Sequence, residues 1–255
     1  MGRLDNKVAI VTGAGQGVGE GIALAMAKEG AKIVVAVRNA QTGPAVTEKI
    51  GDLGGEAIFA QCDVSLQGDV EKTVNAAVMA FGTVDILVNN AHDTRHLHAP
   101  FMETTAEMLH IQLYSGFMAS VWFMQACFPY LKKKGGRVIN MGSGAGVRGE
   151  IGLLGYAASK EATRAATRVA AREWGEFGIT VNCICPLADS PAMTTYVEHP
   201  EMGWNRILPV LPIKRLGACE SEIGRTAVFL ASADAAFITG HTIHVDGGYT
   251  MDAGR

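Results

Sequence analysis

Short β-branched runs alternate with helix-like segments along nearly all of the 255 residues, and this alternation limits the fold more than any other feature. Seven runs have the length and composition of strands: 7–12, 32–37, 57–61, 85–89, 137–140, 179–184 and 242–246. Strands that are apolar throughout are typical of a parallel sheet covered on both faces, because helices form the crossovers between them. We therefore predict an α/β fold with a single doubly wound domain over residues 1–255.

Composition narrows the class of partner. Hydrophobic residues make up 48% and charged residues 18% of the chain, and the net charge of -3 argues against a nucleic-acid or anionic-membrane surface. No apolar run reaches the roughly 18 residues of a membrane span. The opening residues lack the basic start and apolar run of a secretory leader, and the five cysteines include no CxxC pair. We expect a cytoplasmic protein that acts on a small molecule.

A glycine-rich turn follows the first predicted strand, in the stretch TGAGQGVGEG at residues 12–21. Ligands of doubly wound sheets bind beyond the carboxyl ends of the strands. The spacing Gly13-x3-Gly17-x-Gly19 lets backbone N–H groups approach a phosphate at the start of a helix, where the dipole favours an anion. Gln16 and Val18 lie in the same turn. We expect these residues to bind the phosphates of a dinucleotide, although the G-x-G-x-x-G spacing itself is absent.

Other carboxyl ends supply further candidates for cofactor binding. The second carries Val37 and Arg38 where an NAD enzyme usually has an acid for the ribose hydroxyls. An arginine can instead bind a 2′-phosphate through charge-assisted hydrogen bonds, which favours NADP and leaves NAD as the alternative. The third and fourth ends add four candidates: Asp63, Val64, Asn90 and Ala91.

A tyrosine and a lysine lie one helical turn apart in GYAASKEA, residues 155–162. Tyr156 and Lys160 share one helix face because their spacing is four. A free phenol has a pKa of about 10. An ammonium ~4 Å away stabilises the phenolate by about 1 kcal/mol in bulk water and about 4 kcal/mol at an effective dielectric of 20. The pair is therefore suited to acid–base chemistry in a cleft with little water. Ser143, 13 residues before Tyr156, follows the fifth predicted strand at the same edge of the sheet.

These motifs resemble those of the classical short-chain dehydrogenase/reductase family, and the resemblance extends from about residue 7 to residue 249. Further matching motifs are Asn89-Asn90-Ala91, Pro186 and the closing TGHTIHVDGG. The resemblance implies a Rossmann-like, seven-stranded parallel sheet of order 3-2-1-4-5-6-7 and a nicotinamide cofactor. It implies hydride exchange between that cofactor and a carbonyl or secondary alcohol. It also implies a homotetramer, with helices around 105–132 and 156–177 in the subunit contacts.

The resemblance also implies roles for individual side chains. Tyr156 would give a proton to the carbonyl oxygen or take one from the alcohol, and Ser143 would hold that oxygen by a hydrogen bond. Lys160 would stabilise the phenolate and bind the nicotinamide ribose. Pro186 and Ser190 would lie near the nicotinamide, with Ser190 in the place of a threonine that usually binds the carboxamide.

The sequence departs from the family pattern at several positions. His92 replaces a glycine after Asn-Asn-Ala, and Leu187 replaces a glycine after Pro186. Gln112 replaces the asparagine that supports a helix kink and a proton relay, so its catalytic role stays open. Gln16 occupies a place where NADP-using relatives often have a second basic residue.

A long connection, residues 186–217, follows the sixth strand and is expected to form the substrate-binding loop. Its side chains Met193 and Trp204, with Leu153 and Leu154 before Tyr156, predict an apolar pocket. Such a pocket favours a bulky alicyclic or aromatic ketone over a sugar or a charged acid. His92 would border the same space; the histidines at 92, 96 and 98 have no fourth ligand beside them, so no metal is expected.

The main hypothesis is an NADP-dependent carbonyl reductase or alcohol dehydrogenase. One alternative is an NAD-dependent alcohol dehydrogenase of the same family. Another is a catalytically weak nucleotide-binding protein, to which the exchanges at Gln112 and Leu187 point. The joint presence of Ser143, Tyr156 and Lys160 argues against this last alternative.

Overall fold

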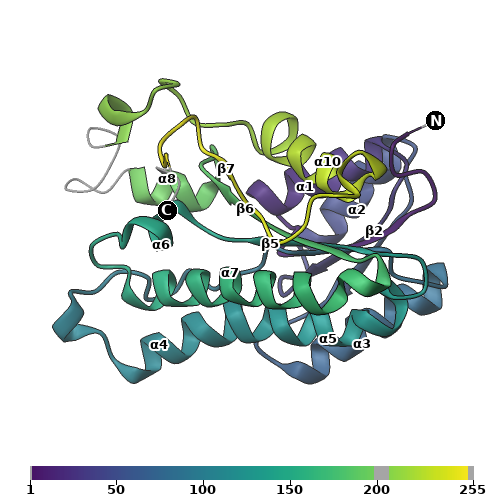
Figure 1. Ribbon diagram of the computed structural model, residues 1–255, viewed down its shortest axis with the longest axis horizontal. Helices are drawn as coiled ribbons and strands as arrows, with labels where there is room; N and C mark the ends of the chain where they lie inside the picture. Colours follow the sequence, from purple (N-terminus) through teal and green to yellow (C-terminus); the bar gives the residue numbers. More distant parts are fainter. Residues whose placement is uncertain (1, 198–206, 252–255) are drawn as a thin grey trace.

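A seven-stranded parallel sheet forms the centre of the molecule in the computed structural model, which describes residues 2–197 and 207–251 (Figure 1). Its order is β3-β2-β1-β4-β5-β6-β7. The strands are β1 (Val8–Thr12), β2 (Lys32–Val37), β3 (Ala57–Gln61), β4 (Ile86–Asn89), β5 (Arg137–Met141), β6 (Thr180–Pro186) and β7 (Thr242–Val245). The predicted doubly wound α/β fold and its strand order are confirmed.

Helices cover both faces of the sheet, with α1, α2 and α10 on one side and α3, α5 and α7 on the other (Figure 1). The α-helices are α1 (Gly17–Lys28), α2 (Thr42–Asp52), α3 (Gln67–Phe81), α4 (Ala106–Gln112), α5 (Ala119–Leu131), α6 (Gly144–Arg148), α7 (Leu154–Trp174), α8 (Pro191–Val197) and α10 (Arg225–Ala231). Short 3-10 and π segments are η1 (Phe101–Glu103), η2 (Leu113–Met118), η3 (Gly175–Phe177), η4 (Leu208–Val210), η5 (Cys219–Gly224) and η6 (Ala233–Ala235).

The two faces of the sheet have separate apolar cores. Strand β1 sends Ala9 and Val11 into the core beneath α1, while Ile10 between them joins the core beneath α3 and α5. Alternate residues of a strand point to opposite faces, so a strand buried on both faces is apolar at most of its positions. This pattern explains why the strands could be located from their composition.

A chain of buried amides ties α7 to the sheet. Asn89 on β4 donates to the side-chain oxygen of Asn140 on β5 at 2.8 Å, and Asn140 donates to Thr167 on α7 at 2.9 Å. Asn140 is 0% exposed, and hydrogen bonds in such surroundings are costly to lose. These bonds fix the position of α7, whose first turns carry Tyr156 and Lys160.

The long helix expected around residues 105–132 is interrupted. A π-helical turn, η2, separates α4 from α5 directly after Gln112. Ser115 and Ser120 each return a side-chain hydrogen bond of 2.7 Å to a carbonyl four residues earlier, which accommodates the widened turn. The interruption brings Gln112 to the end of a helix that faces the start of α7.

The predicted substrate-binding loop, 186–217, contains helix α8 and the turn η4. Leu187, Ile207 and Leu211 form a small core of their own, against which Met193 and Tyr249 pack. Trp204 lies outside the described residues. Leu187 thus anchors the loop, and this packing is a role for the side chain at a position where the family that the sequence resembles has glycine.

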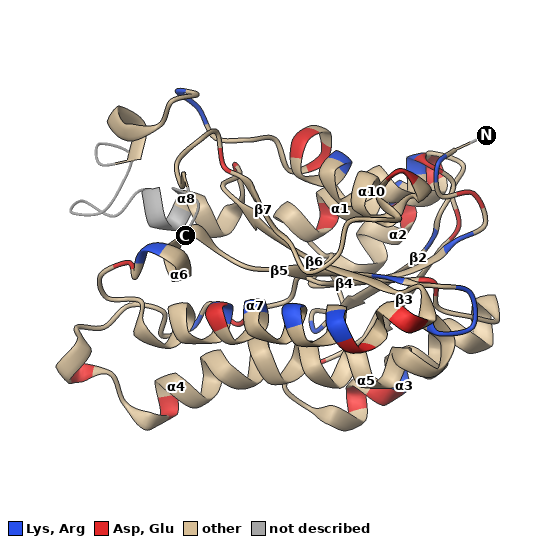
Figure 2. Cartoon of the chain, in the orientation of Figure 1, with Lys and Arg blue, Asp and Glu red and all other residues tan. Residues whose placement is uncertain are grey.

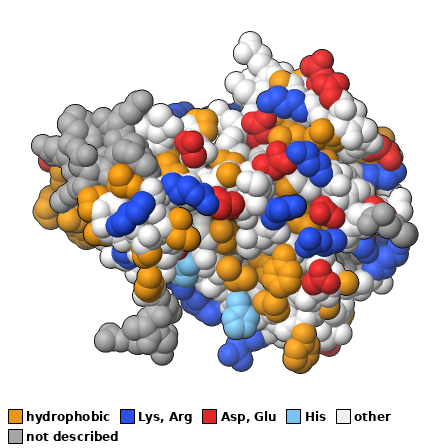
Figure 3. Space-filling view, turned by 90° about the horizontal axis from the view of Figure 1, so that it is seen from above, with side chains coloured by type: hydrophobic (Ala, Val, Ile, Leu, Met, Phe, Trp, Pro, Cys, Tyr) orange, Lys and Arg blue, Asp and Glu red, His pale blue; other side chains and the backbone are white. Residues whose placement is uncertain are grey.

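Charged side chains are distributed unevenly over the helices. Residues 113–131, which form η2 and α5, contain no Lys, Arg, Asp or Glu, whereas α7 carries both signs (Figure 2). On the face that bears α1 and α10, blue and red side chains are intermixed with apolar ones (Figure 3). Among the described helices, none has both the length and the apolar character needed to cross a bilayer.

We expect the contact between α1 and η5 to tolerate no side chain at Gly21. A Cβ there would lie 2.6 Å from the carbonyl oxygen of Cys219. Gly21→Ala should therefore lower the free energy of unfolding by about 1–3 kcal/mol through overpacking. Gly51→Ala, at a position of α2 with open space around it, is the matched control and should raise it by roughly 0.5–1 kcal/mol. Urea unfolding of both variants measures this, and similar values for the two would contradict the packing argument.

Candidate active site

A cavity of about 750 Å³ runs along the carboxyl edge of the sheet, from the glycine turn after β1 to the start of α7. It brings together most of the residues proposed from the sequence. Its wall includes Gly13, Gln16, Gly17, Val18, Gly19, Arg38, Asp63, Val64, Asn90, Ala91, His92, Ser143, Leu153, Tyr156, Lys160, Pro186, Ser190 and Met193.

The glycine turn has the shape that a dinucleotide phosphate requires. Gly13 and Gly17 have φ values of +64° and +58°, in the region that favours glycine. A Cβ on Gly19 would collide with the carbonyl oxygen of Gly13. Gln16, the N-cap of α1, makes no side-chain hydrogen bond to the helix, so no side chain at the cap satisfies the first N–H groups. These features fit a diphosphate at the start of α1.

The ends of β1 and β4 are braced together beneath the cavity. The Thr12 hydroxyl accepts hydrogen bonds from the backbone N–H groups of Asn90 at 2.9 Å and Ala91 at 3.0 Å. The Asn90 side chain donates to the Thr12 carbonyl oxygen at 2.9 Å. This brace holds open the crevice where the strand order reverses, which is where such sheets bind nucleotides.

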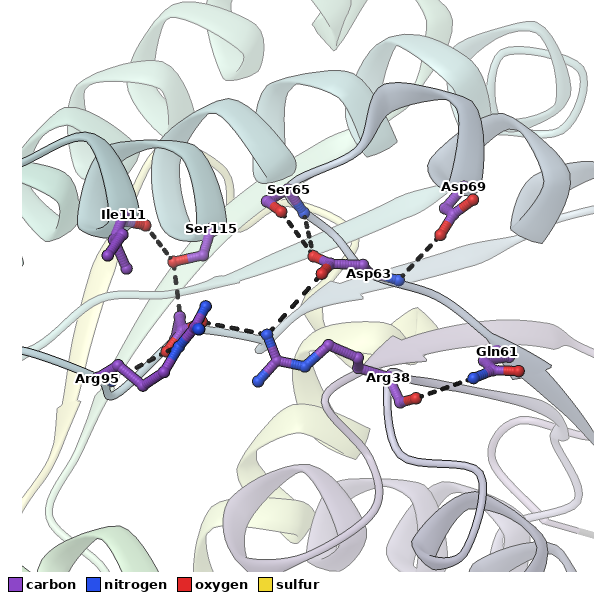
Figure 4. A network of polar contacts seen from close by, with 9 residues as sticks. Arg38, Gln61, Asp63, Ser65, Asp69, Arg95, Ile111 and Ser115 are labelled. Atoms are coloured by element: carbon purple, nitrogen blue, oxygen red, sulfur yellow. Dashed lines mark hydrogen bonds and ion pairs between the residues drawn. The ribbon is translucent and has the colours of Figure 1, made fainter. Parts of the chain in front are cut away.

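Two arginines and two carboxylates form a network at the far end of the cavity (Figure 4). Arg38 donates to Asp93 at 3.2 Å and lies 3.8 Å from Asp63. Arg95 donates to both oxygens of Asp93, at 2.6–3.0 Å. Burial would raise the pKa of the Asp93 carboxyl, but hydrogen bonds from Arg95 and Arg38 outweigh it and lower that pKa to about 2. Arg38 remains 57% exposed, so its guanidinium is accessible to a ligand.

Ser143, Tyr156 and Lys160 meet at the other end. Ser143 is the N-cap of α6, where its Oγ accepts from the Ala145 N–H at 3.2 Å. Lys160, only 5% exposed, donates to the Met141 carbonyl oxygen at 2.9 Å. Its ammonium lies 5.5 Å from the centre of the Tyr156 ring. The three groups therefore border one cavity, with the cation held in surroundings of low solvent content, where its charge acts strongly.

His92 stands between Tyr156 and the end of α4. Its Nε2 lies 2.6 Å from Oε1 of Gln112, and its ring meets the Tyr156 ring edge to face, with centroids 4.8 Å apart. Burial lowers the pKa of His92 to about 3, and the positive charge of Lys160 acts in the same direction. The imidazole is therefore neutral at ordinary pH.

Comparison with known proteins places this site in a family. The family model described as Enoyl-(Acyl carrier protein) reductase matches residues 13–250. A 12alpha-hydroxysteroid dehydrogenase of Clostridium sp. is 39% identical, over 97% of this chain and 98% of the relative. The chain belongs to the short-chain dehydrogenase/reductase family. It is accordingly an NAD(P)-dependent oxidoreductase of carbonyl and alcohol groups.

Two other members of the short-chain dehydrogenase/reductase family are similar along their whole lengths. The 3-oxoacyl-(acyl-carrier-protein) reductase FabG of Vibrio cholerae is 36% identical over 97% of this chain and 99% of its own. A solved 7 alpha-hydroxysteroid dehydrogenase, in complex with NADH and 7-oxo glycochenodeoxycholic acid, is 34% identical. It superposes with a TM-score of 0.91 and covers 96% of this chain and 95% of that chain.

Two positions of this short-chain dehydrogenase/reductase lie elsewhere than the sequence suggested. Gln112 is buried behind His92 and does not line the cavity; its amide nitrogen donates to the Arg95 carbonyl oxygen at 2.8 Å. Leu153 lines the cavity, whereas its neighbour Leu154 does not. Ser190, by contrast, lines the cavity; it also caps α8 by accepting from the Met193 N–H at 3.3 Å, and its hydroxyl proton remains available to a ligand.

Sequence reasoning missed part of the wall. Asp93 lies in the wall four residues after the end of β4, and its partner Arg95 follows two residues later, so the rule that ligands bind at carboxyl ends could have pointed to them. Arg148 stacks on Tyr249, 3.9 Å from the ring centre, and donates to Thr250 at 2.6 Å. No local pattern indicates that contact, since its partners are about 100 residues apart. Within residues 2–197 and 207–251, no three His, Cys, Asp or Glu side chains form a metal site.

Proposed function

We propose that this protein is an NADP-dependent oxidoreductase that interconverts a bulky, largely apolar ketone and its secondary alcohol. The observation that carries the proposal is the convergence of Ser143, Tyr156 and Lys160 on the cavity that also contains the glycine turn. A catalytically weak nucleotide-binding protein would have no use for this arrangement of hydroxyl, phenol and ammonium.

The chain's own groups can carry the proton chemistry. When bound, the nicotinamide cofactor supplies or accepts the hydride. Tyr156 gives its phenolic proton to the oxygen as that atom gains charge, and takes the proton back in the reverse direction. Ser143 donates a hydrogen bond to the same oxygen. The Lys160 ammonium stabilises the phenolate; Met141 accepts one of its three N–H bonds, which leaves donors for a ribose hydroxyl.

The network at Arg38 supports NADP as the cofactor. A 2′-phosphate would compete with Asp93 for the Arg38 guanidinium. Asp93 keeps its bonds to Arg95 when Arg38 turns away, so it is not left as an unpaired charge. The related 7 alpha-hydroxysteroid dehydrogenase was solved with NADH, and Val37 followed by Arg38 is our reason for proposing the phosphorylated cofactor here.

The substrate end of the cavity supports a bulky ketone. Its apolar wall consists of Leu97, Leu153, Leu187, Met193, Ile207 and Tyr249. Two charged side chains of the cavity wall pair with each other, since Arg148 lies 3.3 Å from Glu150. Two relatives are named hydroxysteroid dehydrogenases, which act on large alicyclic molecules. We therefore propose an alicyclic or aromatic ketone over a sugar or a charged acid.

We also propose a homotetramer in the cytoplasm. The uncharged segment 113–131 lies beside α7. Three apolar side chains of this region are exposed: Tyr114 on η2 at 37%, Val169 on α7 at 55% and Phe177 on η3 at 38%. An apolar surface of this kind favours contact with another subunit. The five cysteines are free thiols, and four of them are buried, as suits a reducing compartment.

We expect Tyr156→Phe to lower kcat by at least ~10²-fold, because it removes the proton donor and leaves the ring in place. The dissociation constant of the cofactor, measured by fluorescence quenching, should stay nearly unchanged. Tyr130→Phe on α5, outside the cavity, is the matched control and should keep the parent rate. A Tyr156→Phe variant with a near-normal rate would overturn the mechanism.

NADP should be used with roughly tenfold to a hundredfold higher kcat/KM than NAD, since each charge-assisted hydrogen bond contributes about 1.5–3 kcal/mol. Arg38→Gln should remove most of this preference by weakening NADP use while NAD use is nearly unchanged. Lys49→Gln, a loss of the same charge on α2 outside the cavity, should leave the ratio as it is. Steady-state kinetics with both cofactors decide; a parent that uses NAD equally well rules out the assignment.

Efficiency should rise with apolar size in a series from acetone through cyclohexanone to aryl and polycyclic ketones. Each additional buried methylene contributes about 0.8 kcal/mol until the cavity is filled. The comparison is made by kcat/KM at saturating cofactor. The assigned substrate class fails if the series is flat, or if a carboxylated or polyhydroxylated ketone of equal size is clearly preferred.

A further inference from the structure

The amide of Gln112 fixes the protonation of His92. Its nitrogen donates to the Arg95 carbonyl oxygen at 2.8 Å, and a carbonyl can only accept, so the amide orientation is determined. The oxygen of Gln112 is therefore the atom that lies 2.6 Å from Nε2 of His92. Since that oxygen also only accepts, the proton of the neutral imidazole must be on Nε2. Nδ1 is then a lone-pair acceptor, and within the described part of the chain it is buried with no partner.

His92 and Gln112 occupy spaces that two glycines leave free. A Cβ on Gly116, in the π turn η2, would lie 2.6 Å from Nδ1 of His92. A Cβ on Gly155, beside Tyr156, would lie 3.1 Å from Cγ of Gln112. The stem of Gln112 thus packs on the backbone next to the tyrosine, while its amide reaches the imidazole. A side chain one methylene shorter would not fill both positions.

We propose that His92 and Gln112 form one positioning unit for Tyr156, in which Gln112 fixes the imidazole and the imidazole fixes the direction of the phenol. This inference rests on the proposed function, because it assigns the unit a role in the same proton transfer. It concerns the two positions at which the sequence departs from the family pattern beside the catalytic tyrosine.

Such support matters because the tyrosine lies in a weakly capped turn. Tyr156 is the third residue of α7, and Leu153 at the N-cap makes no side-chain hydrogen bond to that helix. An uncapped first turn is prone to fraying. The His92 ring packs edge to face on the phenol ring at 4.8 Å between centroids, which restricts rotation of the phenol.

The imidazole acts through geometry and does not itself exchange protons. The titratable groups near it are the Lys160 ammonium, the Asp93 carboxylate and the Tyr156 phenol. Burial and the Lys160 charge keep the imidazole neutral, with a pKa of about 3 that is far below working pH. A neutral ring beside Lys160 leaves the field of that cation on the phenol undiminished.

A double-mutant cycle tests whether the two residues act together. His92→Gly and Gln112→Asn should each lower kcat on the order of tenfold, with the cofactor dissociation constant nearly unchanged. The double variant restores the family's usual pair of residues, which needs no bond between them. Its kcat should therefore exceed that of either single variant. If the kcat of the double variant falls by the product of the two single losses, the proposal is overturned.

Two controls separate positioning from general damage. His96→Gly makes the same exchange on the same loop, at an exposed residue with a φ of +53°, and should keep the parent kcat. Deuterium at the transferred position of the alcohol should give a larger isotope effect in both single variants, because a misdirected phenol slows the chemical step. An isotope effect unchanged from the parent, with a lowered kcat, would contradict the role of the unit.

A measurement without turnover tests the geometry by itself. In spectra of ¹⁵N-histidine-labelled protein, the signal missing from His92→Gly belongs to His92. It should show the Nε2–H tautomer, without titration between about pH 5 and 8, and should change in Gln112→Ala. The opposite tautomer, or a titrating ring, overturns the unit whatever the activity. A parent that shows the expected signal but reduces no ketone overturns the proposed function instead.

Discussion

The hydroxyl of Thr12 joins the two strands between which the strand order of the sheet reverses. By accepting from the N–H groups of Asn90 and Ala91, it satisfies backbone donors that parallel pairing leaves unused at the strand end. The chain leaving β4 is thereby directed across the crevice, and this path places His92 beside Tyr156 and Asp93 beside Arg38. The end of the cavity that holds Tyr156 and the end that holds Arg38 both depend on this brace.

The two ends of the cavity use charge in different ways. At the end that holds Arg38, the guanidinium is 57% exposed, so its ion pairs with Asp63 and Asp93 are screened by water and can be exchanged for those of a ligand. At the other end, Lys160 is buried and bonded to a carbonyl, so its field is fixed and poorly screened. The first arrangement suits selective binding, and the second suits stabilisation of a transient phenolate.

Much of this architecture could be predicted from the sequence, and the limits have physical causes. The strands were placed to within one or two residues because burial on both faces favours nearly continuous apolar runs, as at 33–37 in β2. Tyr156 and Lys160 came together because one helix carries both. The partner of Gln112 could not be predicted, since it depends on a side-chain rotamer and on a π turn without a clear sequence signal. The stacking of Arg148 on Tyr249 joins segments too far apart for any local pattern.

Helix α7 takes part in catalysis and in the core at once. Its first turn carries Tyr156, its second Lys160, and its middle holds Thr167 in the amide chain that crosses two strands. Because Thr167 ties its middle and the His92 ring supports its first turn, the helix opens only with the protein as a whole. Heat inactivation and global melting should therefore be a single event. The fraction of activity that survives at a given temperature would then equal the fraction of molecules that remain folded.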